Sequence, residues 1–494
     1  MKFFTQHLSI FHDSNFCLYD ENNLYYLKLE RYVEQKHFHH GMLLNTSENQ
    51  KKSLRLVNLI VKQIYGLDLN CKRSKIDHHL RHALSMELFS NKKYDVHVVI
   101  DGFGDENVWS IFRNDRVVYQ QNALIAGGSI GDIMYFLGKK LELKGHHLDF
   151  AGKVMGLQSY GKFNCKYYEK LKKYDMSSLG DKLNIYDEIK KINRPYTRQD
   201  AFYSLRDGYD VYDLSKINSK EEKIDALHTI HKRLGEIVLS IFEKYVSPNE
   251  RVAYSGGVAQ NVVWNTELKK RYPKLEILPH CGDEGLSFGV MEFYRKKHNL
   301  NFDLSRYPFM QSDEAPDDEP TIETIQKTAR HLANGKIVAW YQGHGEVGPR
   351  ALGHRSIFMD PRIKDGKDII NRVKNRELFR PFGASVLHEY AKEYFDLDFE
   401  NPYMLYLGTT QKDNLDAITH VDGTCRAQTV NKDFDLHFRL LLEYFYDMTG
   451  CPVLLNTSLN EAGKPIAGWI RNAMNEFNTK AIDVLVVGNT IYEK

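Results

Sequence analysis

A glycine-rich segment with three arginines, residues 343–362, is the part of the sequence best suited to bind an anion. Arg350, Arg355 and Arg362 lie close together in the chain, and glycines and a proline interrupt the backbone around them. Clustered guanidinium groups repel one another unless an anion lies between them, and their planar donors match phosphate or carboxylate. Glycine turns let backbone N–H groups point at the same ligand. The segment predicts an anion site, and the alternative is a surface loop with solvated arginines.

More polar residues of the same kind occur further along the chain. Arginines combined with amide and hydroxyl groups at strand ends form a preorganised cradle for a small, doubly charged phosphate ester. The residues that we expect in this cradle, besides the three arginines above, are Lys374, Arg376, Arg380, Arg426, Asn456, Ser458 and Asn460. A nucleic-acid groove would more often show dispersed lysines with stacking aromatic residues. This cluster is too compact for that.

His78 and His82 have the spacing of a metal-binding pair. On a helix, residues i and i+4 lie on one face, so both imidazoles could bind one transition metal. A third ligand must come from elsewhere in the chain, and Asp283 in a glycine-flanked turn offers a carboxylate. Nitrogen and oxygen ligands suit iron, manganese or zinc equally. The alternative is a histidine-rich helix start that binds no metal.

Alternation of apolar segments with glycine turns predicts an α/β fold that positions these residues. We expect strands at residues 96–100, 252–255, 336–342 and 452–455, helices at 129–142 and 224–244, and a hairpin over 8–29 that contains His12 and Asp13. Strands that end in glycine turns and carboxylates suit a nucleotide held between two lobes. The residues that we expect at the nucleotide are Asp101, Gly102, Gly104, Lys153, Gly256, Gly257, Val258 and Asn261. Lys153 could equally belong to helix packing.

The length of the chain predicts more than one domain. At 494 residues it exceeds the size of one core, so two or three domains are expected. Residues 311–321 are acidic, contain prolines and are typical of a solvated linker. We therefore expect an N-terminal domain over residues 1–310 and a C-terminal domain over residues 322–494.

Charge and cysteine content exclude several classes of protein. The net charge of +2 creates no whole-chain field for nonspecific nucleic-acid binding. The six cysteines form no Cys-x-x-Cys pair, which argues against a disulfide framework or zinc ribbon and fits a reducing compartment. Polar residues interrupt the N-terminus too early for a signal peptide, and apolar runs are too short to span a membrane. We expect a cytoplasmic protein with no membrane contact.

Together and in order, these motifs resemble those of the NodU/CmcH-type carbamoyltransferases, the family that includes the tobramycin carbamoyltransferase. The resemblance covers nearly the whole chain, and the arginine-containing loop is its most specific part. The segments that carry it are His12–Ser14, Glu30–Arg31, Asp77–His82, Asp101–Gly104, Gly152–Leu157, Gly256–Ala259, Gly282–Gly285, Gly348–Ser356, Asp360–Arg362, Arg380–Phe382, Val421–Arg426 and Asn456–Asn460.

The resemblance implies an actin-like, two-lobed N-terminal domain of the ASKHA type, related to the tRNA threonylcarbamoyl transferases, and a YrdC-like C-terminal α/β domain. It implies that carbamoyl phosphate gives carbamate, that carbamate and ATP give carbamoyl adenylate, and that the carbamoyl group passes to an acceptor hydroxyl. His78, His82 and Asp283 match the family's iron ligands, and Mg²⁺ could accompany the ATP. The residues placed in catalysis are His12, Asp13, Arg350, Arg355, Arg380 and Arg426. A homodimer is compatible with the resemblance.

The acceptor is the part that the resemblance leaves open. Members of the family act on antibiotics, on lipo-oligosaccharides and on hydroxymethylated pyrimidines of phage DNA. Residues 162–222 match nothing in the family pattern, and residues 162–198 interleave lysines and tyrosines on which bases could stack. We lean slightly to a hydroxymethylpyrimidine nucleotide or DNA over a small metabolite or sugar, although solvated helix faces explain the same pattern.

Two other functions remain as alternatives. A tRNA threonylcarbamoyl-type transferase would share both folds, but the fused domain order and the Gly-Pro-Arg-Ala-Leu-Gly loop argue against it. A non-catalytic nucleotide-binding protein would not need a compact arginine cluster.

Overall fold

The computed structural model describes most of the chain. The described residues are 2–7, 13–20, 22–37, 59, 62–63, 76–90, 92–105, 107–122, 129–173 and 212–494. The predictions for His12, for the first part of the hairpin and for residues 174–198 lie outside them. Among the described helices, none combines the length and the apolar character needed to cross a bilayer.

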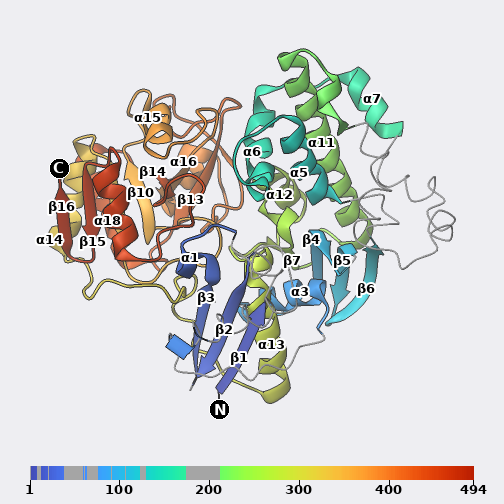
Figure 1. Ribbon diagram of the computed structural model, residues 1–494, viewed down its shortest axis with the longest axis horizontal. Helices are drawn as coiled ribbons and strands as arrows, with labels where there is room; N and C mark the ends of the chain where they lie inside the picture. Colours follow the sequence, from blue (N-terminus) through green and yellow to red (C-terminus); the bar gives the residue numbers. More distant parts are fainter. Residues whose placement is uncertain are drawn as a thin grey trace.

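The N-terminal half contains two sheets (Figure 1). The first is antiparallel and contains β1 (Lys2–His7), β2 (Asn15–Asp20) and β3 (Asn23–Lys28), so the predicted hairpin is confirmed for its described part. The second has the order β6-β5-β4-β7-β8. Its strands are β4 (Val96–Gly104), β5 (Asn107–Arg113), β6 (Arg116–Asn122), β7 (Val252–Ser255) and β8 (Leu275–Glu276).

Parallel pairing within the second sheet places candidate site residues at one edge of that sheet. β4 pairs with β7 in parallel, with Val96 opposite Val252. Both strands therefore end at the same edge, where Asp101 and the Gly256–Gly257 turn meet. The helices of this half are α1 (Leu29–Val33), α3 (His78–Leu88), α5 (Ile130–Lys140), α6 (Phe150–Leu157), α7 (Cys165–Lys173), α11 (Lys220–Tyr245), α12 (Val262–Arg271) and α13 (Leu286–His298).

The C-terminal half is one mixed sheet with helices packed against it (Figure 1). The strand order is β12-β13-β11-β14-β10-β9-β15-β16. Its strands are β9 (Val338–Tyr341), β10 (Arg355–Met359), β11 (Gly383–Leu387), β12 (Gly408–Thr409), β13 (Thr424–Val430), β14 (Val453–Ser458), β15 (Val484–Val487) and β16 (Thr490–Glu493). Its helices are α14 (Ile322–Ala333), α15 (Gly366–Val373), α16 (Ala391–Phe395), α17 (Leu436–Thr449) and α18 (Ile470–Thr479).

The stretch 311–321 is not solvated throughout, so that part of the prediction is wrong. The side chain of Gln311 is buried, and its Oε1 accepts a hydrogen bond from the backbone N–H of Lys28 at 3.1 Å. The side chain of Asp313 is also buried, between Arg31 and Arg355. The exposed residues of this stretch are 317–319 and Thr321. Thr321 then caps α14, because its hydroxyl accepts a hydrogen bond from the backbone N–H of Thr324.

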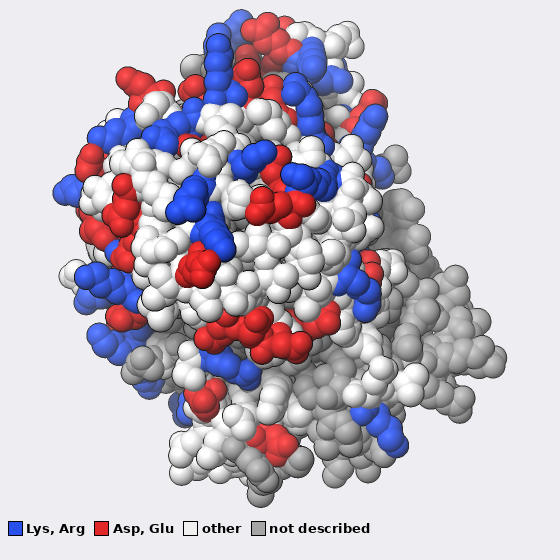
Figure 2. All heavy atoms as spheres, turned by 90° about the vertical axis from the view of Figure 1, so that its left-hand side faces the viewer, with Lys and Arg blue, Asp and Glu red and all other residues white. Residues whose placement is uncertain are grey.

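The two halves are packed against each other. Leu405 and Tyr406 are buried in a hydrophobic cluster that the N-terminal half otherwise forms. Asn265 donates to the carbonyl of Leu405 at 3.1 Å, and the His420 ring contacts the carbonyl of Gly156 at 2.9 Å. On the face of the C-terminal half, acidic and basic side chains are interspersed (Figure 2). That pattern agrees with the small net charge of the chain.

Helices α3 and α13 approach so closely that one position between them tolerates only glycine. A Cβ atom added to Gly289 would lie 1.9 Å from the carbonyl oxygen of Arg81. We predict that Gly289→Ala lowers the free energy of unfolding by about 1–3 kcal/mol, because the helices must separate. Chemical denaturation monitored by circular dichroism measures the change. Gly152→Ala is the control, since a Cβ in that helix meets nothing within 4 Å; an equal loss there would contradict the argument.

Candidate active site

A cavity of about 1440 Å³ lies where the two halves meet. It is large enough to contain several small ligands together. The predicted site residues that line it are Asp13, Asp101, Gly102, Lys153, Gly257, Val258, Asn261, Asp283, Arg350, Lys374, Arg380, Arg426, Asn456, Ser458 and Asn460. The structure therefore brings most of the residues expected for the anion, the nucleotide and the metal to one space.

Two of the predicted anion-binding arginines do not reach the cavity. Arg355 begins β10, its side chain is fully buried, and it donates to the carbonyls of Gly343 and Glu314, both at 2.9 Å. Its guanidinium also lies 3.6 Å from the centre of the Tyr341 ring. Arg362 forms a bidentate pair with Asp360, at 3.0 and 2.7 Å. Their donors are used within the protein, so the prediction that these two bind substrate is corrected.

The remaining cations form a cluster with little compensating charge. Arg350, Arg376, Arg380, Arg426 and Lys374 line one part of the cavity. Burial, followed by the repulsion of neighbouring cations, lowers the pKa of Arg350, Arg426 and Lys374. The Nε atoms of Arg350 and Arg426 are buried and have no hydrogen-bond partner among the described residues. Such a cluster is stable only with an anion bound, because the anion supplies both the missing charge and the missing acceptors.

Hydrogen bonds from the chain orient this cluster. Arg376 donates to the side chain of Asn371 at 2.6 Å and its guanidinium packs on the ring of Phe382. The ammonium of Lys374 donates to the carbonyls of Ser458 and Asn460, and to Asn460 Oδ1 at 3.0 Å. Ser458 ends β14 and Asn460 lies just beyond it, which places both at the predicted strand end. Arg376, which the sequence analysis also places in the anion cradle, lines the cavity as well.

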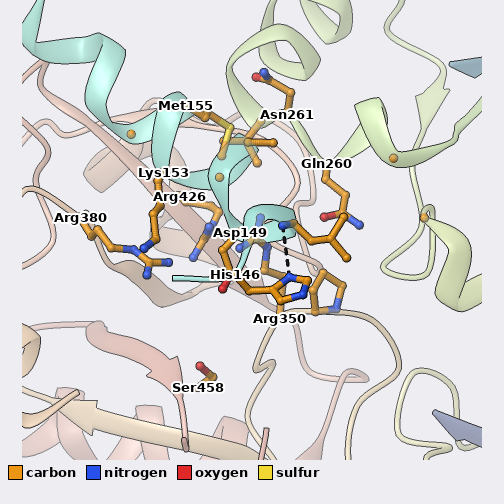
Figure 3. A pocket seen from close by; sticks show the side chains of 18 of the residues that line it. His146, Asp149, Lys153, Met155, Gln260, Asn261, Arg350, Arg380, Arg426 and Ser458 are labelled. Atoms are coloured by element: carbon orange, nitrogen blue, oxygen red, sulfur yellow. Dashed lines mark hydrogen bonds between the residues drawn. The ribbon is translucent and has the colours of Figure 1, made fainter. Parts of the chain in front are cut away.

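Lys153, which the sequence analysis assigned to the nucleotide, lines the cavity and forms an ion pair there. Its ammonium lies 2.6 Å from Glu377 Oε1 and 2.5 Å from the carbonyl of Lys144. Figure 3 shows Lys153 beside Arg380 on one side of the cavity, with Gln260 and Asn261 on the other. The residue therefore joins α6 to the C-terminal half through an ion pair at the cavity wall.

Four residues converge on a space suited to a metal ion. Their ligand atoms, from His78, His82, Asp101 and Asp283, all lie within 4.8 Å of one another. His78 Nε2 is 3.2 Å from Asp101 Oδ2, and His82 Nε2 is 3.3 Å from Asp283 Oδ1. The i, i+4 spacing on α3 thus produces the expected pair of imidazoles. Asp101, which the sequence assigned to the nucleotide, is a fourth candidate ligand.

The electrostatics of this cluster fit a divalent cation. Burial opposes protonation of His78, but the charges and hydrogen bonds of Asp283 and Asp101 raise its pKa to about 10. His82 is completely buried, and neither of its ring nitrogens has a hydrogen-bond partner among the described residues. An unsatisfied buried imidazole beside two carboxylates matches the two-nitrogen, two-oxygen donor set of iron, manganese or zinc.

Glycines around the cluster let the ligands approach. A Cβ atom on Gly104 would lie 2.3 Å from the His78 ring. Gly256 has φ +93°, and a Cβ there would meet the carbonyl of Ile100 at 2.2 Å. This turn directs the N–H of Gly257 to Asp101 Oδ1 at 2.8 Å, so the other carboxylate oxygen is free to face His78. Gly256 and Gly257, which the sequence analysis assigned to the nucleotide, therefore also orient Asp101, a candidate metal ligand.

A second charged cluster in the cavity was not predicted as a unit. The ammonium of Lys28 lies 2.8 Å from Asp13 and 3.1 Å from Glu30. Glu284 is nearby, and burial raises its pKa to about 7. Asn15 donates to the backbone carbonyls of both Asp13 and Asp283, which connects this cluster to the metal-type site. The sequence analysis names its members separately: Asp13 among the catalytic residues, Glu30 in the Glu30–Arg31 segment, and Glu284 in the glycine-flanked turn.

Comparisons with known proteins agree with this arrangement. Residues 10–291 match the family described as Carbamoyltransferase N-terminus, and residues 329–494 match Carbamoyltransferase C-terminus. The chain is 28% identical over 478 residues to the nodulation protein NolNO of Sinorhizobium fredii, covering 89% of this chain and 67% of that protein. It is 29% identical over 335 residues to the 3'-hydroxymethylcephem-O-carbamoyltransferase of Amycolatopsis lactamdurans, covering 65% and 64%.

A solved structure offers only a distant likeness. Component A of the (R)-2-hydroxyglutaryl-CoA dehydratase of Acidaminococcus fermentans aligns with a TM-score of 0.33 and 12% identity, over 61% of this chain and 100% of that chain. That score is too low to support an argument about fold or function.

The metal-type cluster predicts a specific loss on mutation. His82→Ala should abolish stoichiometric metal binding, because a buried nitrogen ligand is removed, while far-ultraviolet circular dichroism remains unchanged. Elemental analysis of the purified variant measures metal content. His97→Ala is a suitable control, since His97 pairs with Glu87 at 2.8 Å outside the cluster. Full metal occupancy in His82→Ala would contradict the assignment.

Proposed function

The chain belongs to the carbamoyltransferase family, and from this premise we propose that it is an ATP-dependent O-carbamoyltransferase that uses carbamoyl phosphate. The observation that carries the proposal is one cavity lined both by the cation cluster around Arg350 and by Asp101 and Asp283, the two carboxylates of the metal-type cluster that also contains His78 and His82. The first suits a phosphate donor and the second a metal-assisted transfer, so one enclosure could hold every step.

The donor would bind among the cations of the C-terminal half. Arg350 and Arg426 have unsatisfied donors there, and Lys374 holds the Ser458–Asn460 turn beside them. Water would cleave the carbonyl–phosphate bond, giving carbamate and inorganic phosphate. The arginines would stabilise the negative charge of the departing phosphate. Carbamate is unstable in water, which is a reason to keep it inside a shared cavity.

Activation and transfer would occur towards the N-terminal half. A carbamate oxygen would attack the α-phosphate of ATP, forming carbamoyl adenylate and releasing pyrophosphate. The Gly256–Gly257 turn and Asn261 would face the nucleotide at the cavity wall. The acceptor oxygen would then attack the carbamoyl carbon, lose its proton and displace AMP. A divalent metal, which we propose to be iron with manganese or zinc as alternatives, would polarise the carbonyl and stabilise the developing charge.

The two halves, to which we assign different steps of the reaction, would also have different domain folds. We propose that residues 1–310 form an actin-like domain related to the tRNA threonylcarbamoyl transferases and that residues 322–494 form a YrdC-like domain. The mixed α/β architecture of both halves supports this relation. His12, as part of the His12–Asp13 pair, would act on the acceptor side, because Asp13 lines the cavity beside Lys28.

We propose a hydroxyl-bearing small molecule, sugar or hydroxymethylpyrimidine nucleotide as acceptor. The relatives include enzymes named for a hydroxymethylcephem acceptor. Helix α7 is the feature that supports a nucleic acid, but two of its lysines, Lys170 and Lys172, contact residues of the same helix. Lys172 lies 3.2 Å from Glu169 and 4.7 Å from the centre of the Tyr168 ring. These contacts favour the small acceptor.

The carbamoyl phosphate step predicts a rescue experiment. Arg350→Ala should reduce pyrophosphate release from ATP and carbamoyl phosphate by about 10²-fold, because one preorganised donor to the phosphate is lost. Carbamoyl adenylate supplied directly should restore transfer, since the N-terminal site is intact. Pyrophosphate release and the mass gain of the acceptor measure the two steps. Arg362→Ala is the matched control and should retain both; loss of both reactions in Arg350→Ala would instead indicate damage to the fold.

The acceptor class predicts a dependence on salt. If DNA is the acceptor, binding releases counterions, so the apparent KM should rise steeply with salt, and Lys170→Ala/Lys172→Ala should raise KM and flatten that rise. Pyrophosphate release should not change, because these lysines do not line the cavity. Steady-state kinetics with hydroxymethylcytosine DNA at several salt concentrations measure this. Activity without salt dependence and without response to the double variant would exclude the nucleic acid.

A further inference from the structure

The loop that carries Arg350 belongs by sequence to the C-terminal half but is docked on the N-terminal half. Val347 is fully buried in a hydrophobic cluster with Tyr26, Phe288 and Met310. Its backbone N–H donates to the carbonyl of Pro308 at 2.9 Å. The loop thus inserts a side chain into the other half immediately before the catalytic arginine.

Gly348 continues this contact. Its φ is +88°, and a Cβ atom there would lie 2.2 Å from the carbonyl oxygen of Pro279. Pro279 lies close in sequence to Asp283, one of the candidate metal ligands. The backbone just before Arg350 is therefore pressed against the segment that leads to the metal-type cluster.

Two buried charged residues fix the same loop. Arg31, in α1 of the N-terminal half, is 2% exposed and donates to the carbonyl of Gly348 at 3.3 Å. Asp313 accepts from the N–H of Gly345 at 2.8 Å and from Arg355 at 3.2 Å, and it lies 3.8 Å from Arg31. A Cβ on Gly345 would meet both Asp313 and Arg31. The Asp313 carboxylate therefore lies between Arg31 of the N-terminal half and Arg355 of the C-terminal half. It also accepts a hydrogen bond from Gly345 at the base of the loop.

The far end of the loop is closed independently. Glu346 is fully buried, and its Oε1 accepts from the N–H groups of Leu352, His354 and Arg355 at 2.8, 2.9 and 3.0 Å. Glu346 thus holds residues 352–355 on the C-terminal side of Arg350, while Arg31 and Asp313 hold residues 345–348 on its N-terminal side.

We infer that Arg31 and Asp313 are positioning residues, which hold the loop that carries Arg350 in place against the N-terminal half. The donor site is then complete only when the two halves are correctly packed against each other. This rests on the proposed function, in which Arg350 binds the phosphate of the donor. Arg31 does not line the cavity and acts through the carbonyl of Gly348. Small displacements of a preorganised group have large effects on binding and rate, so this indirect contact is sufficient to matter.

A double-mutant cycle with inorganic phosphate as probe tests the inference in the full-length chain. Calorimetry would measure phosphate affinity in wild type, Arg31→Met, Arg350→Ala and the double variant. If Arg31 acts through Arg350, Arg31→Met should weaken binding by about tenfold in the wild-type background but have little effect once Arg350 is absent. Arg31→Lys, which keeps the charge next to Asp313, should recover part of the affinity.

Glu34→Ala is the matched control. Glu34 follows α1 and pairs with Arg471 in α18 of the C-terminal half at 3.1 Å, so this variant breaks an exposed ion pair between the same two halves without touching the loop. It should bind phosphate as wild type does. Equal weakening by Arg31→Met in both backgrounds, or no weakening in the wild-type background, would overturn the inference. Unchanged affinity in Arg350→Ala alone would instead refute the proposed donor site, and the inference with it.

Discussion

Repulsion among the cations around Arg350 is the constraint on which the rest of the cavity depends. Four arginines and a lysine share one wall, and within the described part of the chain Glu377 is the acidic residue in closest contact with them. Burying such charge without a partner is costly, so the surrounding structure must hold the cations in place. The Asn371 and Phe382 contacts of Arg376 and the backbone acceptors of Lys374 do this.

The same constraint explains the ion pairs between the halves. Lys153 forms an ion pair with one carboxylate oxygen of Glu377, and Arg380 lies 3.8 Å from the other oxygen. Glu377 therefore compensates the charge of the cation cluster only in part. The cations therefore remain available to a ligand instead of being neutralised by the protein. This arrangement lowers the stability of the fold, but it keeps the site preorganised for a negatively charged molecule. Family membership in the carbamoyltransferases agrees with a donor of that kind.

Local patterns could be predicted from the sequence, and long-range pairings could not. The i, i+4 spacing of His78 and His82 needs only a helix, and the structure confirms that both rings face one space. Asp101 as a fourth ligand depends on β4 lying parallel to β7, which places the Gly257 N–H on its carboxylate. Arg355 looked like an anion ligand, but its position at the start of β10 directs it to carbonyls of its own half. Spacing alone cannot distinguish a donor aimed at substrate from one used by the backbone.

The close contact of α3 with α13 has a consequence for ion selection. Helix α3 carries both histidines, and α13 begins shortly after Asp283, so Gly289 determines how near the two sets of ligands can be. The distance between the two histidines and Asp283 is thus fixed by a backbone contact that involves none of these three residues. At the proposed metal site, an ion of a different radius would require the two helices to move, so the stiffness of this contact would add selectivity that the ligand types do not provide.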